Sequence, residues 1–305
     1  MRIDGKGLID RTKPVRFRFD GKDYAGYKGD TLASALLAND VRLVGRSFKY
    51  HRPRGVLTAG SEEPNALVEV VGPTNQTPNV RATMQEVFEG LVAQSQNRLG
   101  SLRFDLLAVN DYLSPFLSAG FYYKTFMWPR AFWEGLYEPI IRRAAGLGSL
   151  SGKHDAGTYE KAFAFCDVLV IGSGPSGLMA ALTAGRAGAD VILCEESHAL
   201  GGRLISDSQT VGGLPAGDWV ASVVAELQAL PNVRIMARTT VTGAYDNGTY
   251  GALERVGLHK SARPNLPREC FWRIVAKHAV LASGALERPV AFENNDRPGI
   301  MMASA

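Results

Sequence analysis

The chain has 305 residues, which is enough for about two domains and a sizeable core. Apolar residues make up 46% of it and charged residues 21%, and its 34 basic and 30 acidic residues leave a net charge of +4. That composition is ordinary for a globular protein, and the charge is too small to indicate a nucleic-acid or membrane partner.

The cysteines and the N-terminus indicate where the protein resides. Cys166, Cys194 and Cys270 form no CxxC pair and no metal framework, and their odd number argues against a secreted disulfide scaffold. The N-terminal segment has no apolar core of a signal peptide, and no apolar run reaches the roughly 18 residues of a membrane-spanning helix. We therefore expect a cytoplasmic protein with reduced thiols.

Residues 1–90 are predicted to form a small α/β domain. From Pro14 onward, apolar residues alternate with arginines, and Asp20 with the following glycine supplies the turn of a hairpin. Asp30-Thr31 can cap a helix with one apolar face, and ALVEVVG at residues 66–72 predicts a further strand. Hairpin, helix and strand in this order are typical of a β-grasp domain.

A basic and aromatic stretch, RSFKYHRPRGVLTAG, occupies residues 46–60. Its composition could indicate a nucleic-acid patch or a surface turn. A nucleic-acid-binding module would show the same pattern beyond one loop, but the charges outside residues 42–54 are mixed. We therefore expect no nucleic-acid partner.

Residues 91–160 are predicted to be an aromatic-rich connecting segment that ends in a Gly/Ser-rich linker. Lys124, Arg130 and Glu134 rule out a membrane span within it. The aromatic residues could pack one domain onto the other. They could also form a subunit interface, where Tyr, Trp, Phe and Arg are enriched.

Residues 161–305 predict a Rossmann-type dinucleotide-binding domain. An apolar strand at Val168–Ile171 is followed by a glycine turn, an alanine- and leucine-rich helix from Ser176 to Ala187, and a second strand at Val191–Cys194. A short strand that ends near Val241 is expected further along the chain.

The turn has the spacing Gly172-x-Gly174-x-x-Gly177, directly after a strand and at the start of a helix. In that context the motif predicts a dinucleotide site. Gly172 makes the tight turn, Gly174 lets a pyrophosphate approach the backbone, and Gly177 lets helix and strand pack closely. The helix N-terminus offers N–H groups and a partial positive charge to the phosphates.

An acidic residue is expected at the end of the second strand, where a carboxylate binds the ribose hydroxyls. Glu195 stands 18 residues after Gly177, and Glu196 follows it. A carboxylate there would repel a 2′-phosphate, which disfavours NADP. A doubly wound fold without a nucleotide is the alternative for the whole motif, and a solvated surface role is the alternative for Glu196 and Arg203.

Groups for catalysis are harder to find. None of the five histidines has a serine or cysteine partner at a known motif spacing, and none belongs to a zinc signature. No cysteine pair follows the glycine-rich helix, so Cys166 and Cys194 are predicted to have packing roles. We nominate no catalytic residue and no metal ligand.

Two motifs then carry resemblances. Glu195 followed by Gly201-Gly202-Arg203 resembles the two-dinucleotide-binding-domain flavoproteins, in which FAD commonly occupies the fold. RSFKYHRPRG, ALVEV and PNVRATM resemble the 2Fe-2S ferredoxin-like β-grasp domain of amine-oxidising flavoproteins. The cluster cysteines of that domain correspond here to Thr58, Glu63, Ala66 and Thr83, so we expect no iron–sulfur cluster.

Nearly the whole chain resembles the alpha subunit family of heterotetrameric sarcosine oxidases. The matching stretches include TLASALLANDVRLVGRSFKYHRPRG, EEPNALVEV, GSGPSGLMAA and ALERPVAFENNDRPGIM. The resemblance implies oxidative demethylation of sarcosine to glycine with O2, transfer of the one-carbon unit to tetrahydrofolate, and beta, gamma and delta partner subunits. It implies NAD in this chain, with FAD as the alternative, and FAD and FMN on or near a partner subunit.

The resemblance also implies a site and a missing part. The residues expected to bind the cofactor are Gly172, Gly174, Pro175, Ser176, Gly177, Glu195, Glu196, Gly202, Arg203 and Val241. Because alpha subunits of this family are far longer, we expect an N-terminal portion whose dinucleotide domain is incomplete and not catalytic alone. The alternative is an FAD-bearing alpha subunit of an opine or proline dehydrogenase type.

Overall fold

The computed structural model describes residue 2 and residues 8–72, 75–117, 120, 126–146, 148–261, 263 and 265–303. The chain divides into two units, which are treated separately below. Of the described residues, the first unit contains residue 2 and those in the ranges 9–156 and 287–303, and the second contains residue 8 and those in the range 157–286. Residues 287–303 were expected to belong to the dinucleotide-binding domain, and their place in the first unit corrects that boundary.

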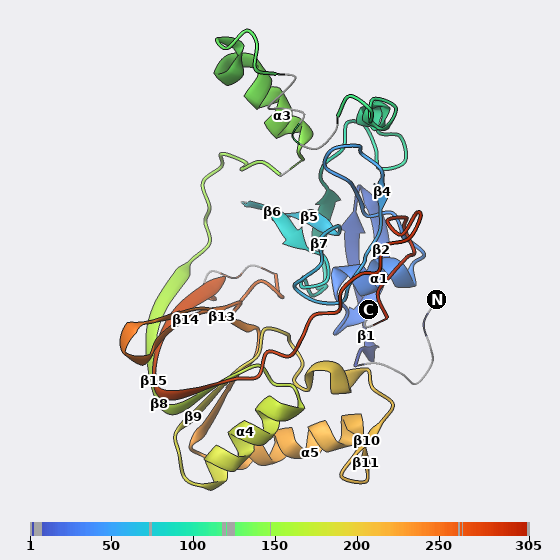
Figure 1. Cartoon of the computed structure of the whole chain (residues 1–305). Coiled ribbons are helices and arrows are strands. Elements are labelled where there is room, and N and C mark those ends of the chain that lie inside the picture. The colour runs from blue at the N-terminus through green and yellow to red at the C-terminus, as the bar shows by residue number, and fades with distance from the viewer. Residues whose placement is uncertain are drawn as a thin grey trace. The chain divides into compact units, whose positions relative to one another are not determined.

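In the described part of the first unit, five strands form a mixed sheet in the order β2-β1-β7-β5-β6 (Figure 1). Strands β1 and β2 pair as the predicted antiparallel hairpin, β7 runs parallel to β1, and β5 pairs antiparallel with both β7 and β6. Asp20 and Gly21 both have positive φ, at 47° and 77°, as a tight hairpin turn requires. The bounds are β1 (Asp10–Phe19), β2 (Lys22–Lys28), β5 (Leu67–Val71), β6 (Gln76–Arg81) and β7 (Leu91–Ser95).

Helix α1 (Leu32–Ala38) covers this sheet. Its N-cap is Thr31, whose side chain accepts a hydrogen bond from the Ser34 amide while the Ser34 hydroxyl accepts one from the Thr31 amide. Leu32 and Leu36 are fully buried and pack with Phe17 in one apolar cluster. The predicted capped helix is therefore present, and Leu32, Ala33, Ala35 and Leu36 are its buried residues in the core of this unit.

The domain boundary predicted after residue 90 is wrong. Strand β7 begins at Leu91 and pairs with β1 and β5 in the interior of the sheet. The sequence LVAQS is too short to show a strand pattern, and the strands with which it pairs lie far away in the sequence. The remaining elements of the unit are short: β3 (Gly45–Arg46), β4 (Pro53–Arg54), the 3-10 helix η1 (Leu106–Asp111), the π-helix η2 (Trp133–Tyr137) and α3 (Glu138–Ala144).

Part of the aromatic connecting segment, residues 118–119 and 121–125, lies outside the described residues. Among those that are described, Phe116 is 76% exposed and Trp128 is 83% exposed. The described part of the segment therefore presents large apolar side chains at the surface of the first unit, and both predictions for it stay open.

The described part of the second unit contains a six-stranded sheet in the order β12-β9-β8-β15-β14-β13. Strands β12, β9, β8 and β15 are parallel, and β14 and β13 continue the sheet in antiparallel pairing. The bounds are β8 (Tyr159–Ile171), β9 (Val191–Cys194), β12 (Val233–Met236), β13 (Thr239–Tyr245), β14 (Thr249–Glu254) and β15 (Glu269–Leu281). A separate pair is formed by β10 (Thr210–Val211) and β11 (Leu214–Pro215), and the short helices are η3 (Gly202–Ile205) and η4 (Asp246–Gly248).

Helices α4 (Pro175–Arg186) and α5 (Ala216–Ala229) lie on the same face of this sheet (Figure 1). Leu178 and Leu182 of α4 and Leu227 of α5 pack with Leu193 of β9 in a buried cluster. The continuous apolar strands and the alanine-rich helix thus build the layered α/β core that the sequence predicted.

Two strands differ from the prediction. Strand β8 begins at Tyr159 rather than at Val168, because its first part pairs with the long β15. The single strand expected to end near Val241 is two strands, since Arg238 takes a positive φ of 58° and turns the chain. Strand β12 before that turn pairs with β9, and β13 after it pairs with β14.

Candidate functional site

The glycine-rich turn joins β8 to α4. Gly172 has φ 99°, and a Cβ there would lie 2.5 Å from the Ala282 carbonyl oxygen. A Cβ on Gly177 would lie 1.9 Å from the Gly172 carbonyl oxygen, so only glycine lets the helix start this close to the strand. At Gly174 a Cβ would meet nothing within 4 Å. The turn is therefore closed toward the protein and open at Gly174, where a pyrophosphate could approach.

Helix α4 begins directly at this opening. Gly174 is its N-cap in an extended conformation, Pro175 occupies the first turn, and Ser176 is exposed. Its first turn contains no acidic residue. The positive end of the helix thus faces the open side of Gly174 with no carboxylate of that turn competing for it, which suits an anion.

Glu195 stands at the end of β9 and is 8% exposed. One carboxylate oxygen, Oε2, accepts hydrogen bonds from the Ser173 amide at 2.9 Å and from the Ser173 hydroxyl at 2.6 Å. The other, Oε1, accepts one from the Ser197 amide at 2.8 Å. The sequence motif identified Glu195 but not Ser173, which occupies the unspecified position between Gly172 and Gly174.

The second glycine loop lies against the first. Gly202 has φ 55°, and a Cβ on it would lie 3.0 Å from the Gly174 Cα, so the two loops approach as closely as glycines allow. The exposed Arg203 donates from Nη2 to the Ala285 carbonyl at 3.0 Å. Gly202 therefore lies beside the glycine-rich turn, whereas Arg203 contacts the loop after β15.

Two expected residues are placed differently. The Glu196 carbonyl accepts a hydrogen bond from the Arg255 guanidinium, so its backbone is tied to the loop after β14. Val241 lies in β13 and packs against the core on the sheet face opposite α4. The residue that reaches the end of β9 is instead Thr239, whose amide donates to the Glu195 carbonyl at 2.7 Å. The prediction missed Thr239 because the turn at Arg238 shifts the strand.

The cysteines of this unit are core residues. Cys166 and Cys194 are buried in the cluster that also contains Met236 and Ile274. Burial raises the pKa of the Cys166 thiol to about 11 and that of Cys194 to about 12. Both thiols are therefore protonated at neutral pH and unreactive, in agreement with the predicted packing roles.

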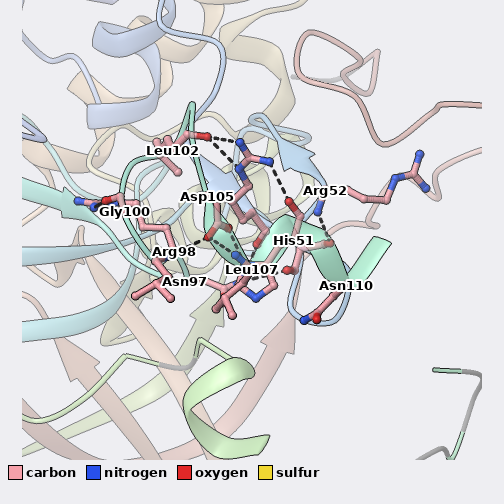
Figure 2. A network of polar contacts seen from close by, with 12 residues as sticks. His51, Arg52, Asn97, Arg98, Gly100, Leu102, Asp105, Leu107 and Asn110 are labelled. Carbon is pink, nitrogen blue, oxygen red and sulfur yellow. Dashed lines mark hydrogen bonds and ion pairs between the residues drawn. The ribbon is translucent and has the colours of Figure 1, made fainter. Parts of the chain in front are cut away.

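In the first unit, Arg46 and His51 of the basic stretch at residues 46–60 contact other parts of their own chain, and Figure 2 shows His51 beside Asp105. Arg46 donates to the carbonyls of Leu102 and His51, each at 2.9 Å. His51 Nδ1 lies 2.6 Å from Asp105 Oδ2, and both side chains are completely buried. Arg46 and His51 thus join the stretch to residues 97–111 and are not available as nucleic-acid contacts.

The other end of the stretch binds residues 287–303. Arg54 forms an ion pair with Asp296, Arg52 lies 3.3 Å from the same carboxylate, and the Met302 amide donates to the Leu57 carbonyl at 2.9 Å. Burial disfavours the Asp296 carboxylate, but the two arginines outweigh it and hold the pKa of Asp296 below its ordinary value. The arginines therefore fasten two parts of the same chain together.

The loop that follows surrounds a buried carboxylate. Glu63 is 1% exposed, and its Oε2 accepts from the Leu57 and Thr58 amides at 2.8 and 2.7 Å and from the Thr58 hydroxyl at 3.2 Å. Its Oε1 accepts from the amides of Asn65 and Ala66 at 2.8 and 3.0 Å. The acceptor positions of both carboxylate oxygens are therefore filled by donors of the same loop.

Two family models match the chain. Residues 12–98 match a 2Fe-2S iron-sulfur cluster binding domain, and residues 167–266 match the FAD dependent oxidoreductases. The second match contains the glycine-rich turn, Glu195 and the second glycine loop. The resemblance implied NAD in this chain, with FAD as the alternative. The matching family is named for FAD.

Relatives match the chain over its whole length. It is 59% identical over 305 residues to sarcosine oxidase subunit alpha of Rhizobium meliloti (strain 1021), in an alignment that covers 100% of this chain and 31% of that subunit. The protein of the same name from Corynebacterium sp. (strain P-1) is 37% identical over 300 residues, 97% of this chain and 26% of that subunit. The chain thus spans less than a third of the length of these curated relatives.

A solved structure agrees with the fold. The crystal structure of L-proline dehydrogenase from P. horikoshii superposes with a TM-score of 0.62 at 23% identity, covering 97% of this chain and 46% of that chain. At this identity the likeness concerns the fold alone.

The first family match corrects one expectation. We expected no iron–sulfur cluster, and the match of residues 12–98 to a cluster-binding domain contradicts this. The expectation considered four side chains, whereas the match concerns the whole segment. The groups present at those positions include the Glu63 carboxylate and the Thr58 and Thr83 hydroxyls, which are not the thiolates that such clusters take. The function proposed below therefore contains no step through a cluster.

Within the described residues, no helix is both long and apolar enough to cross a lipid bilayer.

Proposed function

We propose that this chain, which matches sarcosine oxidase alpha subunits over nearly its whole length and spans less than a third of theirs, is the dinucleotide-binding part of a multi-subunit amine-oxidising flavoprotein. The observation that carries this proposal is the opening at Gly174, which lies between the N-terminus of α4 and the Glu195 carboxylate. An open backbone, a positive helix end and a buried carboxylate on the next strand are what an adenine dinucleotide requires.

Each group has a role in binding. The pyrophosphate lies against the Gly174 backbone and accepts hydrogen bonds from free N–H groups in the first turn of α4, which Pro175, Ser176 and Gly177 form. Glu195 accepts a hydrogen bond from the ribose. FAD, when bound, supplies the two-electron chemistry by which a flavoprotein oxidises an amine. The chain's own residues contribute binding and orientation.

The finer activity follows the family. We place this chain in an enzyme that demethylates sarcosine to glycine with oxygen as the acceptor and passes the one-carbon unit to tetrahydrofolate, together with beta, gamma and delta subunits. The cytoplasm is the compartment that fits its free, buried cysteines.

A second candidate has one observation in its favour. The match of residues 167–266 to FAD dependent oxidoreductases fits equally well an alpha subunit of an opine or proline dehydrogenase type, which passes electrons to a separate acceptor. Turnover of sarcosine with consumption of oxygen by the reconstituted complex distinguishes the sarcosine oxidase from such a dehydrogenase.

The binding site itself is tested by a valine at Gly174. In Gly174→Val the side chain fills the open face of the turn, so the purified chain is expected to lose at least 90% of its bound dinucleotide, on the order of 1.4 kcal/mol or more of affinity. The nucleotide released on denaturation is identified by chromatography and its absorption spectrum.

Gly217→Val in α5 is the matched control, because a Cβ at Gly217 also meets nothing within 4 Å. It should retain the dinucleotide. Equal retention by Gly174→Val and the wild type would refute the proposed site.

A further inference from the structure

The hydroxyl of Ser173 sits where three loops of the second unit converge. Ser173 lies between β8 and α4 and is 0% exposed. Its Oγ donates to Glu195 Oε2 at 2.6 Å, and it accepts a hydrogen bond from the Gly201 amide at 3.2 Å. One buried hydroxyl therefore joins the glycine-rich turn, the end of β9 and the second glycine loop.

We infer that Ser173 is a positioning residue, whose hydroxyl fixes the Glu195 carboxylate so that a single oxygen faces the ribose of an adenine dinucleotide. The inference rests on the dinucleotide-binding function proposed above and deepens it. FAD and NAD both contain this adenosine ribose, so the chemistry at Glu195 is shared by the two cofactors.

The acceptor positions of Glu195 support this assignment. Each oxygen of an ionised carboxylate has about two acceptor positions. Both positions of Oε2 are taken by Ser173, through its amide at 2.9 Å and its hydroxyl at 2.6 Å. Oε1 accepts from the Ser197 amide at 2.8 Å, which leaves one position for a ribose hydroxyl.

The hydroxyl adds orientation that the backbone alone does not supply. A hydrogen bond from a hydroxyl to a carboxylate is short and about twice as strong as one between neutral groups. Together with the Ser197 amide on Oε1, it holds the plane of the carboxylate from both sides. A carboxylate held in this way does not have to be ordered when the ribose binds, which favours binding.

The substitution Ser173→Ala should leave the fold intact. Glu195 Oε2 keeps the Ser173 amide as a donor, and the Gly201 amide keeps the Ser173 carbonyl, which it reaches at 3.0 Å. No buried donor is left without an acceptor by the change. The variant therefore weakens the orientation of the Glu195 carboxylate and leaves no buried donor of the surrounding loops without an acceptor.

The experiment is calorimetric titration of the full chain, stripped of nucleotide, with FAD and, in a separate arm, with NAD. Ser173→Ala is expected to bind the accepted dinucleotide about three- to tenfold more weakly, as loss of one charge-assisted hydrogen bond implies. Thr242→Val is the control. It deletes a hydroxyl of β13 that donates to the Gly251 carbonyl at 3.2 Å, and it should leave affinity within about twofold.

A double-mutant cycle separates positioning from a general structural effect. If Ser173 acts through Glu195, the alanine substitution should weaken binding by less than about twofold in the Glu195→Gln background. An equal loss in both backgrounds would overturn the inference, and so would unchanged affinity in Ser173→Ala alone. Should the alanine variant fail to fold, Ser173→Cys keeps a side chain of similar shape with a weak donor, and wild-type affinity in that variant would also overturn it.

Failure of the underlying function gives a different result. If the wild-type chain binds neither FAD nor NAD, the proposed dinucleotide function fails before any variant is measured. If the wild type binds and the cycle shows no coupling between Ser173 and Glu195, only the positioning role fails.

Discussion

Both units contain a buried glutamate that accepts backbone amides, yet the two carboxylates are used differently. Glu63 of the first unit is 1% exposed, and its oxygens accept four amides and one hydroxyl of its own loop. Glu195 of the second unit is 8% exposed and accepts two amides and one hydroxyl, next to a turn that is open at Gly174. A carboxylate saturated by its own chain is structural, whereas one with an acceptor position left over can bind a ligand.

The surroundings of the two residues extend this contrast. The loop around Glu63 is fastened from one side by the buried pair of His51 and Asp105 and from the other by Arg54 and Asp296. The loop around Glu195 is instead lined by glycines, and one of them, Gly174, leaves open space where a side chain would stand. The first region is built to hold its shape, and the second to admit another molecule.

The largest effect is expected from Glu63→Gln. The amide nitrogen would face backbone N–H donors on one side of the loop and leave at least two of them without an acceptor. The first unit should lose about 3 kcal/mol of stability. Chemical denaturation measures the loss in the free energy of unfolding. The affinity of the folded variant for the dinucleotide, measured by calorimetric titration, should not change.

Glu62→Gln is the control for this substitution. Glu62 is adjacent and only half-buried, and its replacement should alter stability by less than about 0.5 kcal/mol. Equal stability of the Glu63 and Glu62 variants would remove the distinction between a structural and a binding carboxylate.

A smaller effect is expected from acid. Arg54 and Arg52 hold the pKa of Asp296 below 3.8, its ordinary value, despite its burial. A carboxyl with a lowered pKa in the folded state stabilises above its unfolded pKa, and this stabilisation is lost as the pH falls through the folded value. Because the pair is partly solvated, the loss below pH 3.8 should be at most about 1 kcal/mol.

Hydrogen exchange at the Met302 amide reports this contact, because that amide donates to the Leu57 carbonyl. Its protection, corrected for intrinsic exchange, should fall in the wild type as the pH drops below about 3.8. In Asp296→Asn the protection should be lower and independent of pH in this range. A wild-type protection that stays constant would show that the ion pair does not hold the segment.

Local patterns predicted the parts of the fold that depend on neighbours in sequence. The hairpin at Asp20, the helix capped by Thr31 and the strand–turn–helix at Gly172 all follow from spacing and turn chemistry. The glycines and Glu195 of the site were predictable because a motif fixes their positions along one βαβ unit.

The remainder depends on pairing between distant segments. The early start of β8 follows from its partner β15, and the place of residues 287–303 follows from their contact with Arg54. Ser173 and Glu63 could not be identified because their roles depend on which amides a loop brings to one carboxylate, and loop paths leave no periodic signal. Val241 was misplaced because nothing in the sequence marked the turn at Arg238.

Hydrogen exchange of the full chain with and without added FAD tests the central claim most directly. Binding should protect the amides of residues 173–174, 176–178 and 201–203 and leave those of Leu57, Thr58, Asn65 and Ala66 unchanged, because Glu63 already saturates that loop. Protection confined to residues 57–66, or none at residues 173–178 while FAD binds, would contradict the assignment of the dinucleotide site to the turn between β8 and α4.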